Sequence, residues 1–153
     1  MATIYNATDN SPIDLMSLSG TAVVVSIPAA FSDTCTQQCV PGVLERLDDI
    51  KSAGADQVIV VCSDQPFAIN AWVKAEGWAD TDVTFASDFG GREFQGVVGK
   101  LSDEPGKEEL PPLLGHLNRR AYLVIKDGTV TWQKIEDDTT QYTLDVDELI
   151  AAL

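Results

Sequence analysis

The strongest constraint on the fold is a pair of β-branched runs separated by a helical pattern. Thr21–Ile27 and Gln57–Cys62 contain no glycine or proline, as is typical of strands that are covered on both faces. Between them, apolar residues recur at spacings of three and four up to Gly54, namely Val40, Val43, Leu44, Leu47 and Ile50. Such a crossover makes the two strands parallel neighbours and covers one face of the sheet. The pattern predicts an α/β fold.

The α/β alternation continues along the chain. A helical pattern over 66–76 stops at Gly77, and a short strand is expected over 82–86. A short helix is expected over 89–98, although a glycine within it weakens the helix. The stretch 102–118 is rich in proline and glycine, which indicates a long surface loop of the kind that is often functional.

The clearest local signal is a hairpin. Two strands, 120–126 and Thr129–Ile135, are joined by Asp-Gly, the dipeptide that tight hairpin turns favour. Apolar residues over 144–153 then predict a C-terminal helix. Together the elements resemble the thioredoxin-like arrangement, a central mixed β-sheet flanked by helices on both faces.

Length and composition limit the organisation and the partners. With 153 residues, of which 44% are hydrophobic, the chain is expected to form a single domain, 1–153. A net charge of −14 opposes binding to nucleic acid or to anionic lipid, and no apolar run is long enough for a membrane span. The start of the chain has no signal-like pattern, so the expected location is cytoplasmic, with an organelle left open if a targeting segment was removed.

Cys35 stands where chemistry is expected. It follows the strand Thr21–Ile27 by a seven-residue loop and opens the predicted helix. Free N–H groups and the positive end of the helix dipole favour a thiolate over a thiol at such a position. A buried and inert thiol is the alternative interpretation.

The residues around Cys35 resemble a known signature. Pro28-Ala-Ala-Phe-Ser-Asp-Thr-Cys35, followed by Pro41-Gly42, is similar to the active-site motif of peroxiredoxins, in particular the type II plant enzymes and the fungal alkyl hydroperoxide reductases. Segments 57–67, 71–72, 85–88 and 120–128 also match that family in order, so that the resemblance covers residues 15–153.

The resemblance implies a hydroperoxide reductase and assigns its residues. Cys35 would be the peroxidatic cysteine, which becomes a sulfenic acid, and Ser32 would hydrogen-bond the peroxide. Arg120 would stabilise the thiolate and the departing oxygen, with neighbouring Arg119 turned to the other face, and Pro28 would shield the site. The implied partners are a hydroperoxide substrate, thioredoxin, glutaredoxin or glutathione as reductant, and a second copy of the chain in a homodimer.

Three positions depart from the family pattern or need a separate interpretation. Asp33 replaces a common proline, and its charge would disfavour the thiolate if it faced the sulfur; a helix cap is the alternative. Cys39 replaces a histidine and is a possible resolving thiol, provided that the first helical turn unwinds to bring the sulfurs together; otherwise it fills space. Cys62 ends an apolar strand and is expected in the core.

Other activities remain as alternatives. A metal site made of Cys35, Cys39 and His116 lacks a fourth ligand and the usual spacings, so we expect no metal and no cofactor. A dithiol–disulfide oxidoreductase that uses Cys35 and Cys39 is one rival function. A redox-sensing or chaperone-like binding protein with weak peroxidase activity is the other.

Overall fold

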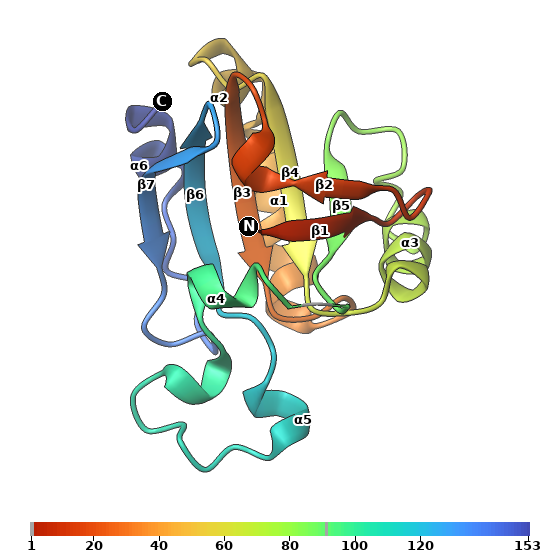
Figure 1. The fold of residues 1–153 in the computed structure, drawn as a ribbon, viewed down its shortest axis with the longest axis vertical. Coiled ribbons are helices and arrows are strands. Elements are labelled where there is room, and N and C mark those ends of the chain that lie inside the picture. Colours follow the sequence, from red (N-terminus) through yellow and green to blue (C-terminus); the bar gives the residue numbers. More distant parts are fainter. Residues whose placement is uncertain (1, 91) are drawn as a thin grey trace.

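A seven-stranded mixed sheet with the strand order β2-β1-β5-β4-β3-β6-β7 organises the chain (Figure 1). The computed structural model describes residues 2–90 and 92–153, so that Met1 and Gly91, the latter inside the predicted helix 89–98, lie outside the described residues. The elements in chain order are β1 (Thr3–Asn6), β2 (Pro12–Asp14), η1 (Leu15–Ser17), β3 (Thr21–Ile27), η2 (Cys35–Cys39), α1 (Val40–Glu45), α2 (Leu47–Ser52), β4 (Gln57–Cys62), α3 (Pro66–Ala75), β5 (Thr84–Ser87), α4 (Gln95–Val98), η3 (Leu101–Asp103), α5 (Pro112–Gly115), β6 (Ala121–Lys126), β7 (Thr129–Ile135) and α6 (Val146–Ala151).

The centre of the sheet follows the sequence pattern. Strands β3 and β4 have the predicted bounds and pair in parallel from Ala22↔Gln57 to Ile27↔Cys62. On its other side β3 pairs with β6 in the antiparallel sense, ending at Ser26↔Ala121. The carboxyl ends of β3 and β4 therefore meet the start of β6 at one end of the sheet.

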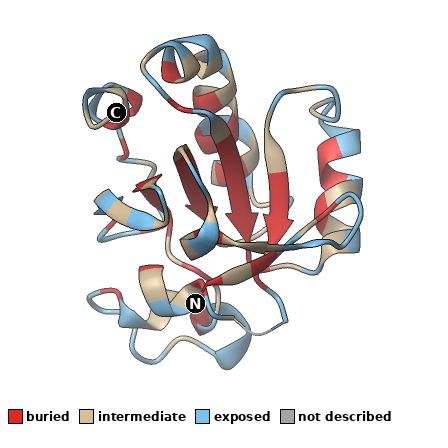
Figure 2. Ribbon diagram, turned by 45° about the horizontal axis from the view of Figure 1, so that its top comes forward, coloured by how far each residue is buried: buried red, intermediate tan, exposed pale blue. Residues whose placement is uncertain are grey.

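Two separate cores cover the two faces of this sheet. On one face, Val23, Val25, Val58 and Val60 pack with buried residues of α1, α2, α3 and α6. On the other face, alternate residues of the same strands pack with Ile4, Leu15, Phe94 and Val98 of the N-terminal segment and the α4 region. Helices thus lie on both faces, as predicted, but the longer ones gather on one. Buried residues, red in Figure 2, follow the central strands, and each buried Val or Ile stabilises the fold by about 1.5–3 kcal/mol.

The predicted helix after Cys35 is broken into three pieces. Its first turn, η2, is a π-helix, followed by α1 and α2, which are separated at Arg46. Pro41 explains the wide first turn, because a proline has no N–H for the carbonyl four residues earlier and its ring clashes with that carbonyl in a regular α-helix. The prediction of one continuous helical pattern was wrong in this respect.

Several shorter elements differ from the sequence-based expectation. Strands β1 and β2 were not predicted, because segments of four and three residues show no clear periodicity. They form a hairpin that runs across the central strands in Figure 1, and β1 pairs with β5 through Tyr5↔Ser87. The helix expected over 89–98 is shorter and consists of α4 alone, which begins at Gln95. The Asp88 carboxylate accepts hydrogen bonds from the N–H groups of Phe94 and Gln95, which places the start of the helix there.

The segment predicted as a surface loop is mostly irregular. Only the short helices η3 and α5 interrupt it. It lies at the end of the sheet where β3 and β4 finish and β6 begins (Figure 1). Throughout the described part of the chain, no helix is long and apolar enough to cross a membrane.

The β6–β7 hairpin is confirmed, with one irregularity. Asp127 and Gly128 both have positive φ, 47° and 80°, as a type I′ turn requires. Past the turn, Ile125 pairs with Val130 but Val124 pairs with Trp132, so that Thr131 is an extra residue in β7. The bulge shifts the rest of the register by one, and Arg120, just before β6, meets Glu136, whose N–H donates to the Arg120 carbonyl at 3.0 Å.

The turn gives a test of the fold. A Cβ added at Gly128 would lie 2.1 Å from the backbone oxygen of Met16, whereas one added at Gly77, also at positive φ, has nothing within 4 Å. We expect Gly128→Ala to lower the free energy of unfolding by about 3 kcal/mol, from strain and overpacking together, and Gly77→Ala by about 1 kcal/mol. Urea unfolding followed by circular dichroism measures both, and equal losses would contradict the close approach to Met16.

Candidate active site

The loop that follows β3 is held in a tight conformation. Pro28 is buried, and Phe31 has φ of 62°, a left-handed conformation that costs a bulky residue free energy and is often found at functional sites. The N–H of Ala30 donates to the Asp64 carboxylate at 2.6 Å. Ser32 is half-buried, and its hydroxyl donates to the Ala29 carbonyl at 3.0 Å. The first of these bonds connects the loop to the segment after β4, and the second closes the loop on itself.

Cys35 lies in the π-helical turn η2, buried against the sheet. Both Cys35 and Cys39 have 0% exposure. The turn closes through a bond from the Val40 N–H to the Cys35 carbonyl. It is also anchored from α3, because the indole N–H of Trp72 donates to the Thr36 hydroxyl at 3.1 Å. Asp33, by contrast, is exposed.

Arg120 reaches Cys35 from the start of β6. Its Nη2 lies 3.6 Å from the Cys35 sulfur, and the arginine is only 1% exposed. Burial by itself disfavours the guanidinium charge, but the neighbouring Cys35 sulfur, Cys39 and Glu136 outweigh it and raise the pKa of Arg120. The structure therefore joins two of the three predicted catalytic residues, although they are 85 positions apart in the sequence.

Two further residues hold the same guanidinium. Nη1 of Arg120 donates to the Glu136 carboxylate at 2.7 Å and to the Thr139 carbonyl at 3.0 Å. The side chain of Glu136 is fully buried. Sequence patterns did not point to either residue, since both follow the last strand of the hairpin and neither belongs to the motif around Cys35.

Arg119 turns away from Cys35, as predicted for neighbouring residues at a strand start. Its guanidinium donates from Nη2 to the Glu136 carbonyl at 2.6 Å, and its own carbonyl accepts from the Ser26 hydroxyl at 2.7 Å. Arg119 therefore supports the segment around Glu136 and leaves the sulfur to Arg120.

The other two cysteines are buried thiols. Burial raises the pKa of Cys39, and the nearby Arg120 charge offsets this only in part. Cys62 lies in the core as predicted, and its sulfur donates to the Asp64 carboxylate at 3.3 Å. Burial, reinforced by that carboxylate, raises the pKa of Cys62. Neither sulfur is a ready nucleophile in this conformation.

His116, the third member of the metal alternative, is exposed in the loop between α5 and β6. Over residues 2–90 and 92–153, no three His, Cys, Asp or Glu side chains are grouped so that they could hold a metal ion.

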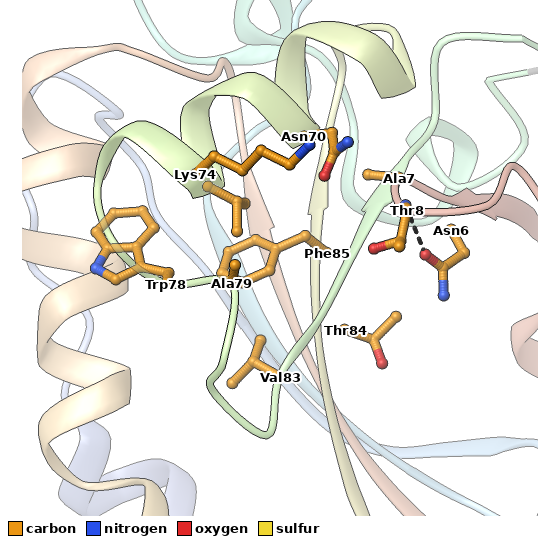
Figure 3. Close-up of a pocket in the computed structure, with 11 residues that line it drawn as sticks. Asn6, Ala7, Thr8, Asn70, Lys74, Trp78, Ala79, Val83, Thr84 and Phe85 are labelled. Carbon is orange, nitrogen blue, oxygen red and sulfur yellow. Dashed lines mark hydrogen bonds between the residues drawn. The ribbon is translucent and has the colours of Figure 1, made fainter.

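A hollow on another part of the molecule is separate from this site. It has a volume of about 220 Å³ and is lined by residues of α3, β5 and the end of β1, with Trp78 stacked beside Phe85 (Figure 3). Lys74, Asn70, Asn6 and Thr8 surround it. Cys35, Ser32 and Arg120 do not line it.

Comparisons with known proteins show the family of the chain. The sequence profile described as Redoxin matches residues 2–153. A protein of Lipomyces kononenkoae named as a peroxisomal peroxiredoxin is 36% identical over 87% of this chain and 75% of its own length. Peroxiredoxin AHP1 of Chaetomium thermophilum is 32% identical over 76% of this chain but only 60% of its own length.

The solved structures show the same fold at lower identity. Reduced Prx3 of Vibrio vulnificus in complex with hydrogen peroxide superposes with a TM-score of 0.81 at 21% identity, covering 99% of this chain and 92% of that one. The names of relatives include peroxisomal, chloroplastic and mitochondrial forms, so the cytoplasmic location stays a prediction. The chain belongs to the Redoxin family, and its relatives are peroxiredoxins, a class of thiol peroxidases.

Proposed function

We propose that this chain reduces hydrogen peroxide and alkyl hydroperoxides at Cys35. The Cys35 thiolate attacks the terminal oxygen of the peroxide, an S–O bond forms, and the O–O bond breaks. Sulfur is oxidised to a sulfenic acid, while the departing oxygen takes a proton and leaves as water or an alcohol. A thiol reductant then returns the sulfur to its starting state.

The observation that carries this proposal is an unused donor beside the sulfur. The Nε of Arg120 is buried and has no hydrogen-bond partner among the described residues. In a planar guanidinium, Nε–H and one Nη2–H point from the same edge, and Nη2 of this arginine is the atom next to Cys35. That edge offers a donor to an oxygen bound at the sulfur, where negative charge develops as the O–O bond breaks.

The loop residues support the same chemistry. Ser32 precedes Cys35 by three residues. Its hydroxyl donates a hydrogen bond to the Ala29 carbonyl, and its oxygen keeps acceptor capacity, so it can accept a hydrogen bond from the O–H of a hydroperoxide. Pro28 is buried at the end of β3 and has no N–H to attract water. We assign peroxide binding to Ser32 and shielding of the thiolate to Pro28.

Burial favours this function over the two rivals. A dithiol–disulfide oxidoreductase acting on proteins needs a sulfur at the surface at the start of its cycle, but in this conformation Cys35 and Cys39 are both fully buried, and a hydroperoxide is a far smaller reactant. In the proposed cycle a protein reductant meets these cysteines only after peroxide has reacted and the turn has unwound. The weak peroxidase alternative depended on Asp33 facing the sulfur. Asp33 is exposed, where water and salt screen its charge.

We assign the resolving role to Cys39. It lies in the same π-helical turn as Cys35, and Cys62, the third cysteine, is held in the core by Asp64. When the turn unwinds, the Cys39 thiol attacks the sulfenic acid, an S–S bond forms, and water leaves. Such unwinding is favoured in this turn because it already departs from the α-helical bonding pattern and precedes a proline.

The proposed partners follow from this cycle. A Cys35–Cys39 disulfide would be reduced by a dithiol such as thioredoxin or glutaredoxin, or by glutathione. The proposed assembly is a homodimer in the cytoplasm.

The central test is the loss of the proposed nucleophile. We expect Cys35→Ser to abolish peroxide consumption in a stopped-flow assay, because a serine hydroxyl does not ionise at neutral pH. Cys62→Ser is the control, since its hydroxyl can donate the same bond to Asp64, and it should keep the wild-type rate. Peroxide consumption by Cys35→Ser at the wild-type rate would refute the proposed function.

The resolving role has its own test. Treated with one equivalent of hydrogen peroxide, the wild type should lose about 2 Da through disulfide formation, whereas Cys39→Ser should gain about 16 Da as a sulfenic acid. Intact mass spectrometry under non-reducing conditions distinguishes the two products. If the wild type also stops at the sulfenic acid, an external thiol must complete the cycle and Cys39 only fills space.

The role of the guanidinium can be tested by a change that keeps the charge. Arg120→Lys replaces a planar set of donors by one ammonium group that cannot serve the sulfur, Glu136 and Thr139 together. We expect a fall of about 100-fold in the second-order rate constant with peroxide, comparable to the loss of one donor to a developing oxyanion. Arg46→Lys makes the same replacement at a surface ion pair and should leave the rate unchanged. A wild-type rate in Arg120→Lys would remove the arginine from the mechanism.

A further inference from the structure

Arg120 can serve Cys35 only if its guanidinium plane is fixed. An arginine side chain has several rotatable bonds, and the contact to Cys35 is a single one at 3.6 Å. The remaining contacts of the guanidinium therefore decide where its free edge points. Nη1 makes both of them, with Glu136 at 2.7 Å and with the Thr139 carbonyl at 3.0 Å.

Glu136 is itself held rigidly. Its Oε1 accepts from Arg120, while its Oε2 accepts from the Thr143 N–H at 2.5 Å and from the Thr143 hydroxyl at 3.2 Å. Its backbone N–H donates to the Arg120 carbonyl at 3.0 Å, and its backbone carbonyl accepts from Arg119 at 2.6 Å. Both carboxylate oxygens and the main chain are thus fixed at a buried position.

The second acceptor is anchored in the same way. The N–H and the hydroxyl of Thr139 both donate to the Glu104 carboxylate, which is fully buried and paired with Lys107 at 2.6 Å. Thr139 therefore presents its carbonyl to Arg120 from a fixed segment. Of the two acceptors, only Glu136 carries charge, which makes it the stronger partner.

We infer that Glu136 is a positioning residue for peroxide reduction, holding Arg120 so that its Nη2 and Nε edge faces Cys35. This inference rests on the proposed function. Glu136 contacts no reacting atom and acts only through the arginine. It differs from a purely structural ion pair because the partner it orients is the donor to the reacting oxygen.

The charge of Glu136 has a second consequence across the reaction. When the thiolate becomes a neutral sulfenic acid, Arg120 loses one of its two anionic neighbours. Glu136 remains, so that the buried guanidinium is never left without a counter-charge, a state that is strongly unfavourable in a protein interior. Without Glu136, the Cys35 thiolate would be the only anion paired with Arg120. The thiolate would still attract the guanidinium, but nothing charged would fix the orientation of its plane.

The test compares two reactions of the same sulfur. Peroxide reduction needs the oriented donor at the departing oxygen, whereas alkylation by iodoacetamide needs only the thiolate. We expect Glu136→Ala to lower the rate constant with hydrogen peroxide by about 100-fold, the scale of a small misplacement of a catalytic group. Glu136→Gln, which keeps an oxygen acceptor without the charge, should recover part of this and fall by about tenfold.

The alkylation rate should behave differently. In both variants it is expected to stay within about threefold of the wild type, so that the ratio of the two rates changes. Asp137→Asn is the matched control, because it removes an exposed carboxylate one residue further along and should change neither rate. Circular dichroism establishes that each variant is folded.

The outcomes separate the inference from the proposed function. A peroxide rate within twofold of wild type in Glu136→Ala, or a proportional fall of both rates, would overturn the positioning role. If Glu136→Ala does not fold, Glu136→Gln decides alone by the same criterion. A wild type without peroxide activity would refute the proposed function but not the positioning role. In that case the Nε–H resonance of Arg120 in a 15N spectrum tests how firmly the guanidinium is held. An equally sharp resonance in wild type and Glu136→Gln would refute the positioning role.

Discussion

The buried positive charge of Arg120 is the interaction on which the site depends. A guanidinium that is 1% exposed is stable only with anionic partners, and this one has the Cys35 sulfur on one side and Glu136 on the other. The same contact stabilises the arginine and places a positive charge beside the sulfur. The stability of the buried arginine and the proposed reactivity of Cys35 therefore depend on the same three side chains.

The sheet brings these side chains together. Strand β3 leads into the loop that carries Cys35, and β6 begins just after Arg120 at the same end because the two strands are antiparallel. Strand β7 returns to that end and delivers Glu136. Three strands that are adjacent in space thus each contribute one part, although the parts come from positions 35, 120 and 136.

The sequence predicted the part of this arrangement that depends on local pattern. The β-branched runs gave β3 and β4 with their correct bounds, and the Asp-Gly dipeptide gave the hairpin. The position of Cys35 at a helix start and of Arg120 at a strand start could also be predicted, with the family resemblance supplying their roles. The π-helical turn could not be predicted from spacing, since spacings of three and four suit an α-helix.

Glu136 shows what the sequence left out. A two-residue turn at Asp127-Gly128 with regular pairing would place Ile135, not Glu136, opposite Arg120. The extra residue Thr131 shifts the register by one, and in a strand a shift of one also exchanges the two faces. A bulge has no reliable sequence signal, so a buried ion pair beyond it stays hidden until the structure is known.

That bulge also limits how this region of the gene can change in length. Gaining one codon between the turn and Glu136, with the bulge kept, would bring Ile135 opposite Arg120 and leave the guanidinium facing an apolar side chain. A loss beyond position 143, after the last contact of Glu136, would leave the pair intact. Strand β7 lies at the edge of the sheet, and its side chains are exposed or half-buried. Its number of residues is nevertheless constrained, because that number decides which residue pairs with Arg120.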